Sequence, residues 1–206
     1  MPEPVRTRVQ WRWFIEATLI IMSVALGFAL AQVGEARADR ELAARALASL
    51  TAEVERNLAI LEPLVPIHDR WVSELADPTA VPEARSGIDV LFGTRPPLPD
   101  GTAPFPILRQ SAWDAAVSGE AFRLIDYDLA TTLSEIYSAQ RLVGDNVDRL
   151  TAGALAATET YDPAHRAASV GLIWLTVADI LAAERVLLAR YEEHLPRIRA
   201  AIEPTR

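Results

Sequence analysis

The 206-residue sequence contains no cysteine and no lysine. Without cysteine, the chain has no thiol nucleophile, no disulfide and no thiolate ligand for zinc. Without lysine, it has no amine for a Schiff base and no P-loop lysine. It also has no G-x-G-x-x-G, and residues 167–171, the nearest match to G-x-S-x-G, lack the first glycine. These absences argue against an enzyme, and we expect no cofactor.

Positive charge is scarce over most of the chain. The formal net charge is −8, and residues 38–206 contain 25 acidic residues against 16 arginines. A protein binds nucleic acid mainly by neutralising phosphates with a basic surface. The acidic balance and the lack of a basic stripe therefore predict that the chain does not bind nucleic acid.

Histidine is also sparse, and the three histidines lie far apart at His68, His165 and His194. A di-iron helical bundle needs two Glu-x-x-His pairs, so that each helix offers two ligands on one face, and the sequence has none. Asp162 and His165 have this spacing, but Asp162 directly precedes Pro163 and is better explained as a helix N-cap. We therefore expect no metal site.

One long stretch without charge stands near the N-terminus. Residues 17–34 carry no charged side chain, and the stretch extends back to Trp13 if Glu16 lies at the membrane interface. Crossing a bilayer takes about 20 apolar residues, and the indoles of Trp11 and Trp13 favour the headgroup region. We predict a single transmembrane helix over residues 13–35.

The flanks of this segment suggest its orientation. The tail before it, residues 1–12, contains three arginines and is short, so we expect it in the cytoplasm and residues 36–206 on the outer side. Two alternatives stay open. The segment is a buried core helix in one, and a signal peptide in the other, because Ala29-Leu30-Ala31 fits a cleavage site that would leave Gln32 as the new N-terminus.

Small side chains repeat at four-residue spacing inside the segment, at Ser23, Gly27 and Ala31. On a helix they form one narrow stripe, and such stripes let two membrane helices approach closely. We predict that this stripe packs against a partner helix, either from a second copy in a homodimer or from another membrane protein.

The helical pattern continues past the membrane segment. An apolar face repeats at steps of three or four up to about Leu61, after which Pro63 and Pro66 are expected to end or kink the helix, with a short helical stretch over residues 67–75. Residues 77–106 hold seven of the 14 prolines. They predict a long Pro-rich loop.

Helix signals return after this loop. Residues 111–114 resemble a capping box with Ser111 as the cap, and Gly119 fits the end of that helix. Asp126 or Asp128 fits the cap of the next helix. Its predicted apolar face, with Gln140 filling one slot, comprises Leu129, Leu133, Ile136, Val143, Val147, Leu150 and Ala154.

The last helix is marked by Asp162-Pro163, a cap followed by proline at the first helical position, and is expected to run to about His194, before Pro196. We find no strand-like alternation and no internal repeat. The predicted fold class is therefore all-α: a transmembrane helix that continues into a bundle of three to four helices.

Several residues together resemble a family of uncharacterised bacterial single-pass inner-membrane proteins with an N-terminal anchor and a helical extracytoplasmic domain. The similarity covers roughly residues 13–62 and 109–140, and Gly34 departs from the family's aromatic or charged residue after the anchor. The resemblance implies a bacterial inner-membrane location with a periplasmic domain, and no established activity. Its matching residues are Glu16, Gly27, residues 35–41, Leu47, Leu50, Glu53, Asn57, Trp113, Ser118, Gly119, Leu124 and Tyr137.

Four residues are candidates for a pocket between helices or for the core itself: Arg109, Trp113, Gly119 and Tyr137. Without a catalytic motif, the sequence favours a membrane-anchored interaction or assembly module. An extracytoplasmic small-ligand sensor that acts through a partner is the alternative, by analogy with other helical bundles behind a membrane helix. An enzyme with an unrecognised site is a third hypothesis.

Overall fold

The computed structural model describes residues 6–76, 86, 105–156 and 162–202, and within them every regular element is helical. The predicted all-α class is therefore confirmed. The predicted Pro-rich loop at 77–106 lies almost entirely outside the described residues. In chain order the elements are α1 (Arg6–Leu75), α3 (Ser111–Ser118), the 3₁₀ turn η1 (Ala121–Leu124), α4 (Tyr127–Ala156), the 3₁₀ turn η3 (Pro163–His165) and α5 (Arg166–Ala200).

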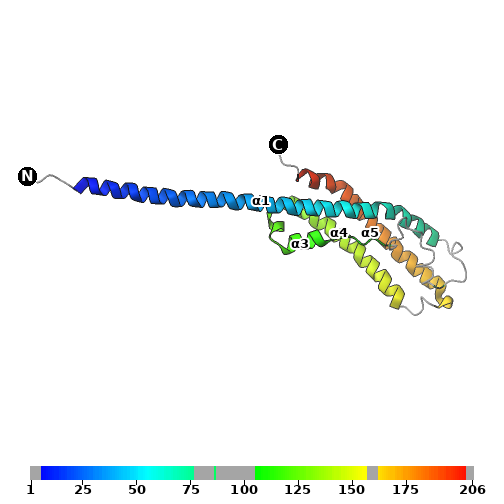
Figure 1. Ribbon diagram of the computed structural model, residues 1–206. Helices are drawn as coiled ribbons and strands as arrows, with labels where there is room; N and C mark the ends of the chain where they lie inside the picture. The colour runs from blue at the N-terminus through cyan, green and yellow to red at the C-terminus, as the bar shows by residue number, and fades with distance from the viewer. Residues whose placement is uncertain (1–5, 77–85, 87–104, 157–161, 203–206) are drawn as a thin grey trace, which may run out of the picture.

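Helix α1 is 70 residues long and extends far beyond the bundle. The bundle packs only against its C-terminal half, while the N-terminal half projects alone (Figure 1). This projecting part is long and apolar enough to cross a membrane, and none of its most apolar 18-residue window is buried. The segment is therefore not part of the core that the described residues of this chain form.

The bundle core lies between the C-terminal half of α1 and helices α4 and α5, and α5 packs against both of the others. Leu50, Val54 and Leu61 of α1 are fully buried and lie four and seven residues apart, which places them on one face of the helix. They pack in one cluster with α4 and α5 residues such as Leu133 and Leu187. A second, smaller cluster surrounds Trp71, Phe105 and Val177.

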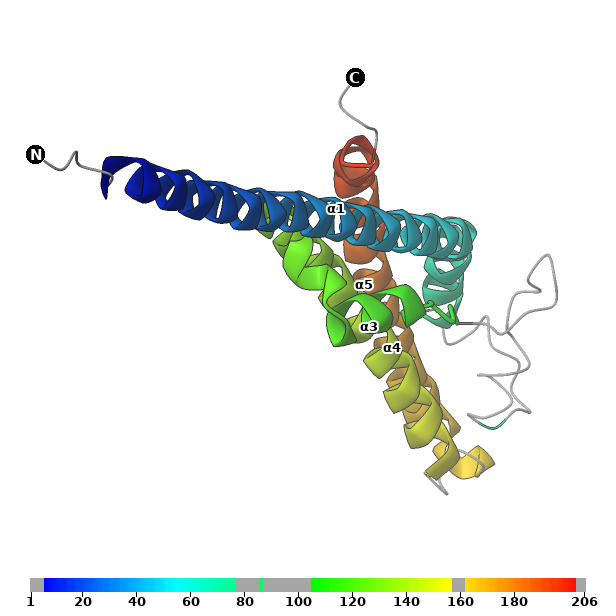
Figure 2. The same ribbon diagram turned by 60° about the vertical axis from the view of Figure 1, so that its left-hand side comes forward.

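Three prolines lie inside helices, contrary to part of the sequence prediction. Pro63 and Pro66 do not end α1 but lie within it, and its last turns bend away from the line of the projecting part (Figure 2). Pro196 likewise lies within α5, which continues past His194 to Ala200. All three prolines are exposed. Buried side chains on the opposite face of each helix offset the hydrogen bond that each proline removes.

The helix start at Ser111 also differs from the prediction. The N-cap residue of α3 is Gln110, and no side chain of the cap bonds the helix, so Ser111 does not act as a capping box. The other predicted signals hold. Asp126 accepts hydrogen bonds from the first turn of α4, and Asp162 accepts one from the backbone of Ala164.

Candidate interaction site at the start of α3

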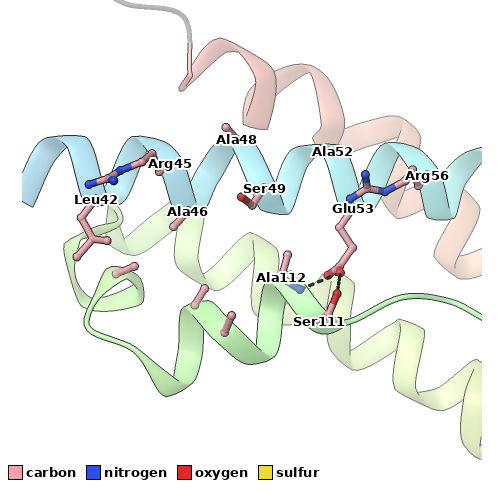
Figure 3. Close-up of a pocket in the computed structure, with 13 residues that line it drawn as sticks. Leu42, Arg45, Ala46, Ala48, Ser49, Ala52, Glu53, Arg56, Ser111 and Ala112 are labelled. Atoms are coloured by element: carbon pink, nitrogen blue, oxygen red, sulfur yellow. Dashed lines mark hydrogen bonds between the residues drawn. The ribbon is translucent and has the colours of Figure 1, made fainter.

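The buried carboxylate of Glu53, on α1, caps helix α3 from outside. Its Oε2 accepts hydrogen bonds from Ser111 Oγ at 3.0 Å and from the Ala112 backbone N–H at 2.8 Å, and Figure 3 shows the side chain pointing at both. Its Oε1 accepts one from the Trp113 N–H at 3.3 Å. A helix N-terminus leaves unpaired N–H groups and favours negative charge. Glu53 therefore supplies the cap that Gln110 does not.

Asn57, one turn after Glu53, holds the residue just before the helix. Its Oδ1 accepts a hydrogen bond from the Arg109 N–H at 2.9 Å, and its Nδ2 donates to the Arg109 carbonyl at 2.7 Å. Gln140 of α4 donates to the same carbonyl at 2.7 Å and accepts from Asn57 and from the Tyr191 hydroxyl of α5. Side chains from α1, α4 and α5 thus fix one short backbone segment.

Aromatic side chains also belong to this hydrogen-bonded network. We call the network the polar clamp; its residues are Glu53, Asn57, Gln140, Tyr137 and Tyr191. The ring of Trp113 stacks on that of Tyr137, with centroids 4.6 Å apart and planes 20° from parallel. The Tyr137 hydroxyl donates to Glu53 Oε1 at 2.8 Å. Burial raises the pKa of Tyr137, and the hydrogen bond to Glu53 raises it further. Burial also raises the pKa of Tyr191, so both hydroxyls remain protonated donors.

The structure brings three of the four candidate residues together at the edge of the core. The backbone of Arg109 is bonded by the clamp, while its side chain is exposed. The rings of Trp113 and Tyr137 stack on each other and leave no pocket between the two side chains. Gly119 is separate from them. It ends α3, where an added Cβ would lie 3.1 Å from the Ala115 carbonyl oxygen. The stripe residues of the anchor all lie on the projecting part of α1 and are exposed.

Sequence reasoning did not find the clamp as a unit. Glu53 and Asn57 stood out only through the family resemblance, and Gln140 only as a polar residue in an apolar stripe. That polar interruption was the available signal, because a buried amide needs partners. Nothing in the spacing indicated that Tyr191, 51 residues later, would complete the network.

A groove of about 720 Å³ lies between α1 and α3, beside the clamp. Arg45 and Arg56 stand at its rim on α1, and the Glu53 carboxylate reaches across its floor (Figure 3). Small residues make the groove smooth, and none of the four sequence candidates lines it. Seven of the lining residues are alanines: Ala46, Ala48, Ala52, Ala112, Ala115, Ala116 and Ala121.

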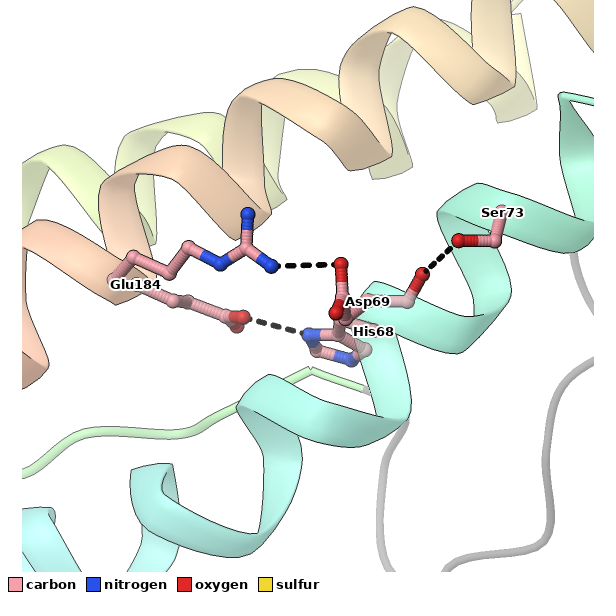
Figure 4. Close-up of polar contacts among 5 residues, drawn as sticks. His68, Asp69, Ser73 and Glu184 are labelled. Atoms are coloured by element: carbon pink, nitrogen blue, oxygen red, sulfur yellow. Dashed lines mark hydrogen bonds and ion pairs between the residues drawn. The ribbon is translucent and has the colours of Figure 1, made fainter.

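A second buried polar contact joins α1 to α5. His68 Nδ1 lies 2.7 Å from Glu184 Oε2, and both side chains are almost fully buried (Figure 4). The ring of Phe105 lies 5.5 Å from the His68 ring, centroid to centroid. At the surface beside this pair, Arg185 donates to Asp69 at 2.7 Å. Two consecutive residues of α1, His68 and Asp69, therefore contact two consecutive residues of α5, Glu184 and Arg185.

Neither contact forms a recognisable reaction centre. Within the described residues, no group of three histidine or carboxylate side chains lies close enough to hold a metal ion. The oxygens of Glu53 are occupied by Ser111, two backbone N–H groups and Tyr137. No family model, no curated protein and no solved structure matches this chain.

Proposed function

We propose that this protein is a membrane-anchored helical interaction module. Residues 13–35 cross a bacterial inner membrane, residues 1–12 stay in the cytoplasm, and the helical domain that begins at residue 36 lies in the periplasm. Its role is to present a rigid helical surface at a fixed distance from the membrane, where it contacts partner proteins.

Exposure of the apolar segment supports the anchor. Large side chains from Trp13 to Val33, including Phe14, Ile21 and Phe28, are mostly more than half exposed in the chain itself. An apolar surface of this length is unfavourable in water unless lipid or another protein covers it. The 22 residues from Trp13 to Gly34 span about 33 Å as a helix, which matches the hydrocarbon thickness of a bilayer.

The observation that carries the proposal is the continuity of α1. A single helix runs from the exposed apolar segment into the bundle, where its residues Leu50, Val54 and Leu61 are fully buried. The helix is therefore anchor and core element at once. A partner that binds the anchor therefore also fixes the distance of the bundle from the membrane and its rotation about the helix axis. Such a fixed placement favours assembly into a complex.

The absence of native cysteine makes a topology test simple, because a single introduced thiol is the only one present. The full-length chain carries either Ser138→Cys, at an exposed site on α4, or Thr7→Cys, in the tail. A maleimide that enters the periplasm but not the cytoplasm is added to cells. We expect it to label Ser138→Cys in intact cells and Thr7→Cys only after lysis, with both variants remaining in the membrane after alkaline extraction.

Other outcomes of this experiment count against the proposal. Release of the protein into the soluble fraction would remove the anchor, and labelling of Thr7→Cys in intact cells would reverse the topology. The mass of the purified protein separates an anchor from a signal peptide, since cleavage after Ala31 would leave a chain that begins at Gln32.

Small-ligand sensing has less support than interaction. Trp113 and Tyr137, which were candidates for a ligand pocket, stack on each other at 4.6 Å. The groove between α1 and α3 is open, and the Glu53 carboxylate in it is already bonded to Ser111 and to the Ala112 N–H. Small-molecule sites are usually enclosed and have a few precisely placed polar groups.

A further inference from the structure

Residues 109–124, which we call the flap, contain α3 and η1 and lie against α1 (Figure 3). The buried side chains of α3 and η1, Ala116 and Ala121, each supply only one methyl group. Trp113 and Phe122 are partly buried, and their rings pack edge-on with centroids 5.2 Å apart. Helix α5, by contrast, buries large apolar side chains along its length. Hydrophobic stabilisation scales with the apolar area removed from water, so it holds the flap less firmly than it holds α5.

Hydrogen bonds between the flap and the bundle are concentrated at the start of the flap. The Glu53 carboxylate accepts three of them from residues 111–113. Asn57 and Gln140 make three more with the backbone of Arg109. Further along, α3 and η1 border the open groove of about 720 Å³. The flap is therefore fastened mainly at one end, by polar contacts.

The bundle half of the polar clamp is assembled by bonds that do not include the flap. The Tyr137 hydroxyl donates to Glu53 at 2.8 Å, and Asn57 donates to the Gln140 side-chain oxygen at 3.0 Å. The Tyr191 hydroxyl donates to the same oxygen at 2.9 Å. These three bonds join α1, α4 and α5 to one another. The groups that bind the flap therefore keep their positions when it leaves.

The bonds to the flap lie at the edge of the bundle, because Arg109 and Ser111 are themselves exposed. When the flap leaves, water replaces it as the hydrogen-bond partner of Glu53 and Asn57. A bond that water replaces contributes much less to stability than a bond whose loss leaves a buried group unpaired. Opening of the flap therefore requires less free energy than unfolding of the bundle.

We propose that the flap opens and closes as one unit while the bundle of α1, α4 and α5 stays folded, and that Glu53 holds it closed. Segments with few buried apolar contacts commonly open in this way, below the free energy of global unfolding. The closed flap covers the Glu53 carboxylate and the ring of Tyr137, and the open flap exposes both, so the domain has two alternative surfaces here. None of the bonds involves residues 13–35, so the inference is independent of the membrane anchor.

Hydrogen exchange of the full-length protein in detergent, followed by mass spectrometry, measures this opening. After correction for intrinsic rates, we expect the amides of residues 114–124 to exchange at least about tenfold faster than those in the buried turns of α5. Low concentrations of denaturant should hardly change the exchange rate of the flap, because its opening exposes little new surface. Flap amides that exchange as slowly as those of α5, with the same response to denaturant, would mean that the flap opens only when the bundle unfolds.

The variant Glu53→Gln tests whether this carboxylate holds the flap closed. The substitution replaces one acceptor oxygen with a donor group, so exchange of the flap should accelerate by about thirtyfold. The acceleration should extend over residues 115–124, which lie beyond the bonds to Glu53, because the flap opens as a unit. Acceleration confined to residues 111–114 would indicate fraying of the first turn of α3 and would contradict the proposal.

The matched control is Ile180→Ala. Ile180 is fully buried on α5 and belongs to the second core cluster, whereas the flap packs against the first. Its truncation should accelerate exchange in α5 by at least about tenfold. Exchange of the flap should change by less than about twofold, because Ile180 stays packed whether the flap is open or closed. Equal acceleration of the flap and of α5 by Ile180→Ala would overturn the proposal.

Discussion

Glu53 is a buried carboxylate whose four hydrogen-bond donors come from residues 58 to 84 positions later in the chain. Removing it leaves the N–H groups of Ala112 and Trp113 and the Tyr137 hydroxyl without partners in the core. Buried polar groups without partners cost about 1–3 kcal/mol each, although neighbouring water and relaxation reduce the sum.

We therefore expect Glu53→Ala to lower the free energy of unfolding by about 3–4 kcal/mol. Glu53→Gln should lower it by about 2 kcal/mol, because an NH₂ group that faces hydrogen-bond donors replaces one of the acceptor oxygens. Denaturant unfolding of the detergent-solubilised protein, followed by circular dichroism, measures the difference. The control is Glu62→Gln, at an exposed site on the same helix, which should change little. A loss below 1 kcal/mol for Glu53→Ala would mean that the clamp does not hold α3.

Tyr137 and Tyr191 make stability sensitive to alkaline pH. Burial raises the pKa of both in the folded protein, so above about pH 10 the unfolded chain releases protons that the folded chain keeps. Their contribution is therefore complete below pH 10 and is lost as pH rises, by about 1.4 kcal/mol per pH unit for each group.

Unfolding free energies measured from pH 8 to pH 11.5 should fall steeply above pH 10, and the fall should be shallower in Tyr137→Phe and shallower still in the double variant with Tyr191→Phe. Comparison of the slopes, rather than of the absolute stabilities, removes the cost of the lost hydrogen bonds. Identical slopes in all three proteins would show that these tyrosines titrate alike in the folded and unfolded states.

At the scale of elements, α1 and α5 are joined by the buried His68–Glu184 contact and the exposed Asp69–Arg185 pair. Removing one partner of a buried pair costs about 3–5 kcal/mol, whereas replacing both with apolar side chains of similar size is often neutral. An exposed pair contributes less than about 1 kcal/mol.

A double-mutant cycle with His68→Phe and Glu184→Leu should therefore show that the double variant is at least about 2 kcal/mol more stable than the sum of the single losses predicts. The same cycle with Asp69→Ala and Arg185→Ala should give a coupling below about 1 kcal/mol. Strictly additive losses at His68 and Glu184 would mean that the two side chains stabilise the bundle independently.

Periodicity in the sequence predicted the helices. The prediction failed where a helix end or cap depends on contacts with another helix. Leu129, Leu133 and Ile136 of α4 are buried as expected, because apolar spacing depends only on the helix itself. Of the two outcomes predicted at Pro63 and Pro66, an end or a kink, the helix continues and bends. The predicted end before Pro196 was wrong, because packing that sequence spacing does not reveal lets α5 continue to Ala200. The cap of α3 was missed for a related reason: its acceptor, Glu53, belongs to a distant helix.

The candidate site was predictable only in part. Trp113 and Tyr137 were singled out as possible pocket or core residues, and the structure places them in one stacked contact. The α1–α3 groove had no sequence signal, because alanines at helical spacing are ordinary in any helix. Its existence depends on how α3 docks, and that depends on the long-range bonds of Glu53 and Asn57.

At the scale of the whole molecule, α1 is a strut that joins an exposed apolar segment to a folded bundle (Figure 1). We propose that lipid covers the segment and that the bundle stands outside the bilayer. Each role belongs to a different stretch of one helix, so rotation or displacement at one end is transmitted to the other.

The most direct test places a spin label at successive single cysteines from residue 13 to residue 44 of the full-length protein in a bilayer. We expect labels up to about Gly34 to collide with dissolved oxygen far more than with a water-soluble nickel complex, and the preference to reverse beyond Glu35. Labels at 17–34 that are shielded from both reagents would place the segment inside a protein core, and labels open to nickel would place it in water. Either result would contradict the membrane anchor.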